Sequence, residues 1–271
     1  MNVDSASDSH NPTTSTVSYG PVLALAWAVR ALPLVIVGVV VAALLPIPWW
    51  VGLLVGLVAA AVWVWALWRS AAGKLLTALG AQPADADTHA RLLNLVRGLS
   101  LAGGAGEPDV FVIDSGARNA AAVASGDTKA LVATRGLLDA VDRVGLEGVV
   151  AESLVRIDNG DAEAATVGAA LFGSMLSGPG GAMLSPVAGY GMSRLLGADR
   201  DLLADQGAVA LTRYPPGLLT ALDAVRAGRA SVDEVPSSLD HVWFVPPRSV
   251  TASAGADDAS LDLRIDVLGE L

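Results

Sequence analysis

The side chains that could carry chemistry in this sequence are few, and they restrict the reactions open to it. The sequence has no cysteine, which excludes disulfides, thiolate zinc sites and cysteine nucleophiles. It has three histidines, His10, His89 and His241, and each belongs to a different segment. The formal net charge of -10 disfavours a nucleic-acid partner, because nucleic-acid binding needs a cationic surface.

Glu152 and Arg156 have the most suggestive spacing. They stand four positions apart in a predicted helix from about Leu146 to Ile157, with the Glu on the N-terminal side, which is the favoured order for an ion pair. Ser153 lies beside them, but it has no evident histidine partner and no nucleophile-elbow glycine pattern, which disfavours a serine hydrolase. His89 falls in the first turn of another predicted helix and is interpreted as a solvated or capping-region residue.

Two long apolar segments precede the helix that carries these residues. The first spans Val22 to Leu45 and is interrupted only by Arg30 and Pro33, and the second, Trp49 to Trp68, carries no charge. Twenty helical residues span about 30 Å, which is one hydrocarbon thickness. The overall composition, 53% hydrophobic and 16% charged, also indicates a membrane protein. The segments predict a transmembrane helical hairpin, with a pair of buried core helices as the alternative.

The distribution of basic residues predicts the orientation of this hairpin. Basic residues follow the second segment and are absent from the turn between the segments. The positive-inside rule then places the main domain in the cytoplasm of a multi-pass plasma-membrane protein. The predicted organisation is a disordered tail (1–20), the transmembrane hairpin (21–69) and the main domain (70–271).

The main domain is predicted to be α+β and mostly helical. Its helical segments are expected at 70–101, with a helix start near Asp87-Thr88, and at 137–141, 146–157, 199–212, 216–227 and 261–271. Its strands are expected at 110–113, 120–124 and 130–134, with a hairpin turn at 125–128. Glycines and prolines split the apolar segment 164–196, which is interpreted as a buried helix pair in preference to a membrane-dipping pair, and 228–260 is expected to be mostly loop.

The order of these elements resembles the HtpX-like family of integral membrane zinc metallopeptidases. The last part of the motif helix and its end read Ile157-Asp158-Asn159-Gly160-Asp161. The likeness covers roughly residues 85–270 and is carried by segments 108–114, 119–122, 130–138, 149–161, 201–205, 241–244 and 263–265. The resemblance implies a zincin-like domain and, by analogy only, a role in membrane-protein quality control.

The same resemblance implies that the zinc motif has been lost. In the family's H-E-x-x-H motif, two histidines bind zinc and the Glu activates the metal-bound water. Here Glu152 and Arg156 occupy the histidine positions, Ser153 occupies the position of the base, and Asp201 occupies that of the third ligand. An arginine cannot ligate zinc, because it stays protonated and offers no lone pair. We therefore expect no catalytic residue, no metal and no cofactor.

In place of the metal, we expect an ion-pair cluster of Glu152, Arg156 and Asp201, with a solvated, non-interacting surface as the alternative. The leading function is a pseudopeptidase that binds proteins. A possible peptide-binding edge strand comprises Asn119, Ala120, Ala121 and Ala122. Two alternatives stay open: an active metallopeptidase whose zinc is held by Glu152, Asp201 and a distant histidine, and a structural subunit of a membrane complex. Membrane lipid and other membrane proteins or peptides are the expected partners, and nucleic acid is not.

Overall fold

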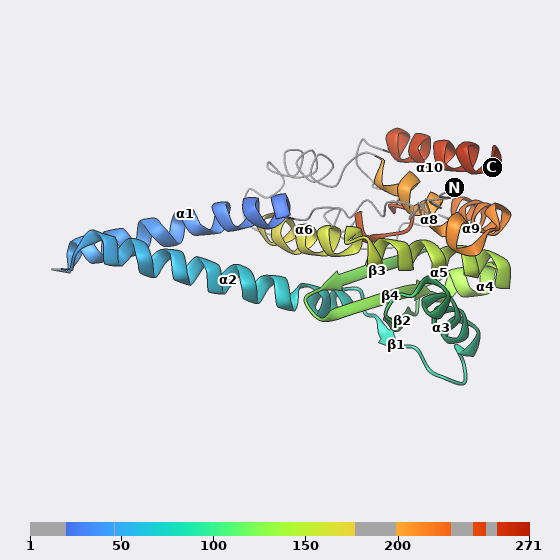
Figure 1. Ribbon diagram of the computed structural model, residues 1–271, viewed down its shortest axis with the longest axis horizontal. Coiled ribbons are helices and arrows are strands. Elements are labelled where there is room, and N and C mark those ends of the chain that lie inside the picture. Colours follow the sequence, from blue (N-terminus) through green and yellow to red (C-terminus); the bar gives the residue numbers. More distant parts are fainter. Residues whose placement is uncertain (1–19, 46, 177–198, 229–240, 248–253) are drawn as a thin grey trace, which may run out of the picture.

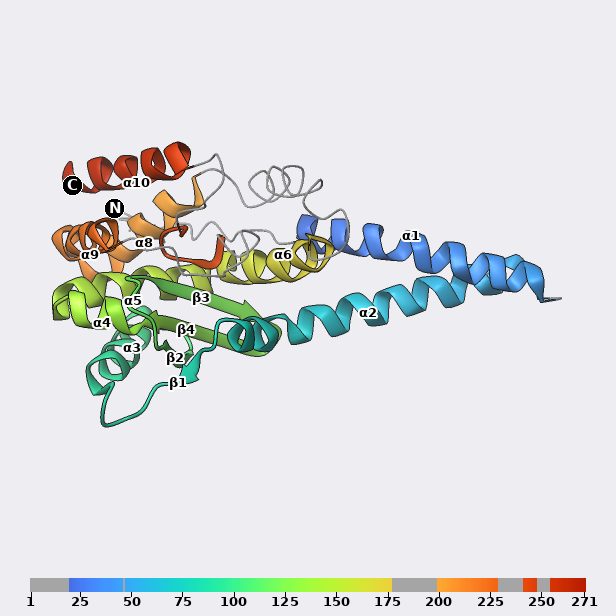
Figure 2. The same ribbon diagram turned by 180° about the vertical axis from the view of Figure 1, so that it is seen from behind.

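Two long helices form a hairpin that projects from one end of the molecule (Figure 1). They are α1 (Gly20–Leu44) and α2 (Trp49–Ala78), and they lie side by side in both views (Figure 2). The remaining elements surround a small sheet at the other end. The fold is therefore mostly helical with one sheet, in agreement with the predicted α+β class.

The computed structural model describes residues 20–45, 47–176, 199–228, 241–247 and 254–271. Residues 1–19 of the predicted tail, which include His10, lie outside this part, as do residues 177–196 of the split apolar segment and residues 229–240 and 248–253 of the expected loop.

The hairpin helices meet through glycines. A Cβ added at Gly38 would lie 2.3 Å from the carbonyl oxygen of Gly52, and one added at Gly56 would lie 2.7 Å from the Cα of Val35. No side chain fits at these points, so the two backbones pack directly, as small residues allow in membrane helix pairs.

Large apolar side chains cover the outside of the hairpin. They include Leu32, Ile36, Val40, Leu44, Trp49, Trp50, Leu54, Val58, Val62 and Trp65. Among the described residues, α2 is the one helix long and apolar enough to cross a membrane, and only 17% of its most apolar window is buried. An exposed apolar surface of this extent indicates contact with lipid. The apolar part of α1, Ala31–Leu44, is shorter, so a two-span topology stays a prediction.

α2 continues without a break from the apolar hairpin into the main domain. The predicted boundary between residues 69 and 70 therefore falls inside one helix. Beyond it, Ala72 and Leu76 are buried in a cluster with residues of the sheet, and the backbone N–H of Ala72 donates to the Ser125 hydroxyl at 2.8 Å. The indole Nε1 of Trp68 donates to Glu163 at 2.7 Å.

The helical pattern predicted over 70–101 is interrupted, while the helix start predicted near Asp87-Thr88 is confirmed within a few residues. The chain turns at Gly80, whose φ of 63° suits glycine, and then forms the short strand β1 (Gln82–Pro83). The next helix, α3, spans Ala90–Gly103 and begins after His89. Helical periodicity is present on both sides of this turn, and the sequence pattern did not place the turn itself.

The sheet has the strand order β1-β2-β4-β3. β2 (Asp109–Ile113) runs parallel to β4 (Thr128–Thr134), and β3 (Ala120–Ser125) pairs antiparallel with β4. The predicted strands and the hairpin turn between β3 and β4 are confirmed, with Gly126 in the left-handed region at the turn (φ 58°). All six residues of β3 are buried, because α2, α5 and α6 pack near it.

The helices after the sheet are α4 (Arg135–Ala140), α5 (Arg143–Asp158), α6 (Asp161–Leu176), α8 (Arg200–Thr212), α9 (Pro215–Ala227) and α10 (Ala254–Gly269). α4 and α5 begin at side-chain caps: Thr134 accepts from the N–H of Leu137, and Asp142 accepts from that of Gly145. α10 begins before the predicted 261, so part of the expected loop is helical. α5 is the central helix and contacts β3, α3, α8 and α9.

Candidate functional site: a buried ion-pair network

Arg156 lies at the centre of a buried group of charged side chains. Its side chain is 2% exposed, and its guanidinium donates to three carboxylates from three elements. Nε donates to Glu152 of α5 at 2.5 Å, Nη2 to Asp201 of α8 at 2.6 Å, and Nη1 to Asp161 at the start of α6 at 3.3 Å. The structure thus brings together Glu152, Arg156 and Asp201, the three residues of the predicted cluster.

Two further arginines extend this group. Arg264 of α10 binds Asp205 of α8 in a bidentate pair with both N···O distances at 2.7 Å, and it lies 3.8 Å from Glu152. Arg200 contacts Asp161 and Asp201, each at 3.4 Å, and donates to the backbone carbonyl of His241. We call the seven side chains the arginine network: Glu152, Arg156, Asp161, Arg200, Asp201, Asp205 and Arg264.

The arginine network carries an excess of negative charge, since four carboxylates face three guanidinium groups. Burial raises the pKa of Glu152 to about 7, although Arg156 and Arg264 oppose the shift. Burial also opposes the ionisation of Asp201, but Arg156, Arg200 and Arg264 outweigh it and hold the pKa of Asp201 well below its usual value. A proton on Glu152 would leave three carboxylates facing three guanidinium groups.

The residues present do not fit a zinc ion. Zinc needs converging lone pairs from several ligands. Here the Arg156 guanidinium lies between Glu152 and Asp201 and donates to both, so the two carboxylates that could bind a metal are already bound to a cation. Among the residues that the structure describes, no group of three His, Cys, Asp or Glu side chains could hold a metal ion.

The two described histidines do not complete such a site. His241 lies near the network, and burial together with the charge of Arg200 lowers its pKa to about 4. Its contact with the network is through its backbone carbonyl, which accepts from Arg200. His89 is the N-terminal cap position of α3, and its Nδ1 accepts from the backbone N–H of Asp85 at 3.1 Å, as its capping-region interpretation anticipated.

Ser153 has no partner that could activate it. It is 1% exposed, and its hydroxyl makes no hydrogen bond with any described residue. Nucleophilic catalysis needs a base within hydrogen-bond reach of the attacking oxygen. The local structure therefore agrees with the sequence argument against a serine hydrolase.

The expected peptide-binding edge is covered by the chain itself. Ala121 forms an antiparallel bridge with Trp243, and the N–H of Phe244 donates to the carbonyl of Ala120 at 2.7 Å. The Asn119 amide donates to the Val245 carbonyl at 2.6 Å. An exposed edge over Asn119, Ala120, Ala121 and Ala122 was thus the wrong expectation, because a segment more than a hundred residues later occupies it.

Further along β3, the N–H of Ala124 donates to the Thr166 hydroxyl of α6 at 3.1 Å. The same strand is thus covered by two different elements.

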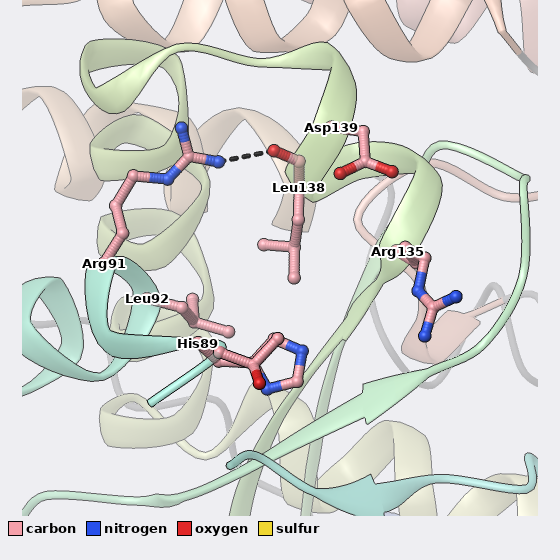
Figure 3. Close-up of a pocket in the computed structure, with 7 residues that line it drawn as sticks. His89, Arg91, Leu92, Arg135, Leu138 and Asp139 are labelled. Carbon is pink, nitrogen blue, oxygen red and sulfur yellow. Dashed lines mark hydrogen bonds between the residues drawn. The ribbon is translucent and has the colours of Figure 1, made fainter. Parts of the chain in front are cut away.

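A cleft of about 500 Å³ opens on another face, between the start of α3 and α4 (Figure 3). Arg91 reaches across it to the carbonyls of Leu138 and Val141, where it satisfies acceptors at the end of α4. Arg135 at its rim pairs with Asp114 at 3.0 Å. These cations already have structural partners, so the arginine network remains the stronger candidate site.

Sequence reasoning missed four members of the arginine network: Asp161, Arg200, Asp205 and Arg264. Asp161 is the first residue of α6. Asp201 and Asp205 are four residues apart on one helix, which places both on the face that meets Arg156 and Arg264. That spacing was the available signal, whereas nothing in the spacing of the arginines themselves reveals their partners.

The fold and the site define an α+β protein with an apolar helical hairpin and a buried ion-pair centre. Its sequence is similar to the Protease HtpX homolog of Dictyoglomus thermophilum, with 31% identity over 184 residues, 58% of this chain and 60% of that protein. It is also similar to the homologs of Dictyoglomus turgidum (27% over 205 residues, 66% and 67%) and Tropheryma whipplei (28% over 199 residues, 62% and 67%).

These matches confirm the resemblance to HtpX-like proteins found in the sequence. The chain spans about three fifths of the length of the first of these relatives. No family model matches the sequence, and no solved structure matches the chain.

Proposed function

We propose that this chain is a membrane-anchored, catalytically inactive relative of the HtpX-type peptidases, with a protein-binding or regulatory role. The observation that carries the proposal is the position of Arg156, which donates to both Glu152 and Asp201. In the proposed correspondence these are two of the metal-ligand positions. The arginine network then joins the helices that a zinc ion would otherwise bridge.

Two further features support a loss of peptide cleavage. Hydrolysis by a zinc peptidase needs a base to activate the metal-bound water, and the matching position is Ser153. It also needs access for an extended peptide, while β3 is paired with Trp243 and Phe244 of the same chain. Each change alone would slow the reaction. Together they remove both the base that activates water and the free strand edge that binds a peptide.

The retained scaffold supports a binding role. The arginine network joins α5, α6, α8 and α10, so the domain keeps a fixed shape without a metal. A rigid domain attached to a membrane anchor can present a surface to other membrane proteins. A place in membrane-protein quality control follows by analogy with the relatives named as proteases, and not from the site.

Metal analysis and a proteolysis assay test the loss of catalysis. The full chain, purified in detergent, is expected to contain far less than one zinc per molecule and to show no chelator-sensitive cleavage of casein. The matched variant, Glu152→His with Ser153→Glu and Arg156→His, rebuilds H-E-x-x-H and is expected to gain zinc if the positions correspond. Stoichiometric zinc or chelator-sensitive cleavage in the unchanged chain would overturn the proposal.

Cysteine labelling tests the proposed cytoplasmic location of the main domain. Since the sequence has no cysteine, each introduced thiol is the single reactive one. Ile47→Cys places a thiol at the exposed hairpin turn, and Ala86→Cys places one on the exposed surface of the main domain. An impermeant maleimide added to intact cells is expected to label the first and not the second. The reverse pattern would place the main domain outside.

A further inference from the structure

A shallow recess lies next to the point where α2 leaves its apolar region. From Trp49 to Arg69 the helix rises about 30 Å, so Arg69 lies at the level of the second membrane interface if Trp49 is at the first. The recess has a volume of about 560 Å³. We call it the juxtamembrane recess, and it is lined by Arg69, Ser70, Gly73, Lys74, Thr77, Ala78 and Thr128.

The lining of the juxtamembrane recess suits a phosphate group. It contains two cations, three hydroxyl groups and no carboxylate, in a chain whose formal net charge is -10. Lys74 is exposed and has no ion-pair partner among the described residues. The space beside Gly73 is open, since a Cβ added there would meet no heavy atom within 4 Å.

Arg69 has a partner that a stronger anion can replace. It pairs with Asp127 at 2.8 Å, and the two side chains are 53% and 82% exposed. Exposed pairs of this kind contribute little net stability, so a phosphate can displace the carboxylate at low cost. Asp127 belongs to the turn between β3 and β4, which places a bound anion in contact with the sheet as well as with α2.

The face of α2 that enters the recess is apolar on the membrane side. At spacings of three or four residues, this face consists of Val58, Val62, Trp65, Arg69 and Gly73. The first three are each more than half exposed, and the Trp65 ring lies 5.9 Å from the Arg69 guanidinium. Acyl chains can therefore lie along the same helix face that carries the cations at its end. A phospholipid would contact both parts of this face, whereas a free phosphate ion would contact only the cations.

We propose that the juxtamembrane recess binds the headgroup phosphate of an anionic phospholipid, with its acyl chains along Val58, Val62 and Trp65. Arg69 and Lys74 supply the charge, and the bound phosphate competes with Asp127 for Arg69. The inference rests on the membrane anchoring in the proposed function and is independent of the loss of catalysis. The labelling experiment above tests the anchoring separately, so a failure of the anchoring can be distinguished from a failure of the lipid site.

Lipid titration tests this site. The full chain in detergent is titrated with dioctanoyl phosphatidylglycerol, dioctanoyl phosphatidylcholine and inorganic phosphate, and bound lipid is counted by native mass spectrometry. The unchanged chain is expected to prefer phosphatidylglycerol, and Arg69→Gln with Lys74→Gln is expected to weaken that binding at least about tenfold, since basic residues at a charged membrane surface contribute about 1 kcal/mol each. The control Arg97→Gln removes another exposed, singly paired arginine, whose partner is Glu107, and is expected to keep the preference.

A steric variant separates the recess from general charge attraction. Gly73→Phe fills the open space while both cations stay in place, and it too is expected to abolish the preference. Circular dichroism checks that each variant remains folded. Equal binding of the two lipids by the unchanged chain, a preference that survives either recess variant, or inorganic phosphate binding as tightly as the lipid would each overturn the proposal.

Discussion

The hairpin and the arginine network hold helices together in opposite ways. Between α1 and α2, backbones meet at Gly38 and Gly52 with no side chain between them. Between α5, α6, α8 and α10, seven long or charged side chains fill the space and are almost completely buried, apart from the partly exposed Asp201. The first contact tolerates no added atoms, and the second tolerates no lost charge. The difference follows from the surroundings of the two contacts. The acyl region of a membrane contains no charged groups that could pair with side chains, and an unpaired charge in the protein interior is destabilising.

Removing the central cation is expected to have the largest effect. Arg156→Met leaves Glu152, Asp161 and Asp201 with fewer partners in a buried site, which is expected to destabilise the fold by about 3–5 kcal/mol. Chemical unfolding followed by circular dichroism measures the loss. Arg226→Met is the matched control, since Arg226 makes two exposed ion pairs with Asp223 and Asp262, and a change of about 1 kcal/mol or less is expected. Equal effects of the two substitutions would contradict a structural role for the network.

The pH dependence of stability tests the charge excess of the network. Because the folded pKa of Glu152 is about 7 and its ordinary value is 4.5, its stabilising contribution is complete below about pH 4.5 and is lost as the pH rises through 7. The expected loss is on the order of 3 kcal/mol from a fully buried group. Glu152→Gln, which stays neutral, is expected to flatten the curve between pH 4.5 and 7. Asp201 acts in the opposite direction at a lower pH, since its lowered pKa makes its contribution disappear as the pH falls below about 3.8.

Two glycines of α2 test the close backbone contact in the hairpin. A Cβ at Gly52 would lie 2.2 Å from the carbonyl oxygen of Gly38, so Gly52→Ala is expected to destabilise the hairpin by about 1–3 kcal/mol. Gly73→Ala meets no neighbour and is expected to stabilise by about 1 kcal/mol, since alanine favours a helix. Thermal unfolding in detergent measures whether each substitution raises or lowers the stability. Stabilisation by the first substitution would mean that α1 and α2 do not pack as described.

The smallest expected effect concerns the contact between the two regions. Trp68→Phe keeps the aromatic ring but removes the hydrogen bond of 2.7 Å from the indole to Glu163. A loss of about 1 kcal/mol is expected, as for a typical hydrogen bond with a charged acceptor in a partly buried place. Trp65→Phe is the comparison variant and is expected to leave the free energy of unfolding nearly unchanged, because Trp65 is 56% exposed.

Local spacing predicted the parts of this protein that depend on neighbouring residues. The pair of Glu152 and Arg156 follows from one helical turn, and the hairpin of β3 and β4 follows from two short β-like runs on either side of a turn sequence that contains Gly126. The position of the turn at Gly80 was harder to predict, because the turn is shorter than the window over which helical periodicity is read.

Contacts between distant segments were not accessible to the same reasoning. Asp201 joined the prediction only through the family resemblance, and Arg264, 108 residues or more beyond Glu152 and Arg156, was not assigned a role. The pairing of Trp243 with Ala121 likewise depends on how the chain returns to the sheet, which a single sequence does not specify. An edge strand was therefore expected to be open where the folded chain closes it.

The unbroken course of α2 has a mechanical consequence. One end of this helix lies in the apolar hairpin, and the other is fixed to the sheet by Ala72, Leu76 and the hydrogen bond to Ser125. A helix without a hinge transmits tilt along its whole length as a stiff lever does. A change in the tilt of α2 would therefore be carried to β3, β4 and α6, which this helix contacts. The apolar hairpin and the sheet are thus connected by one continuous helix.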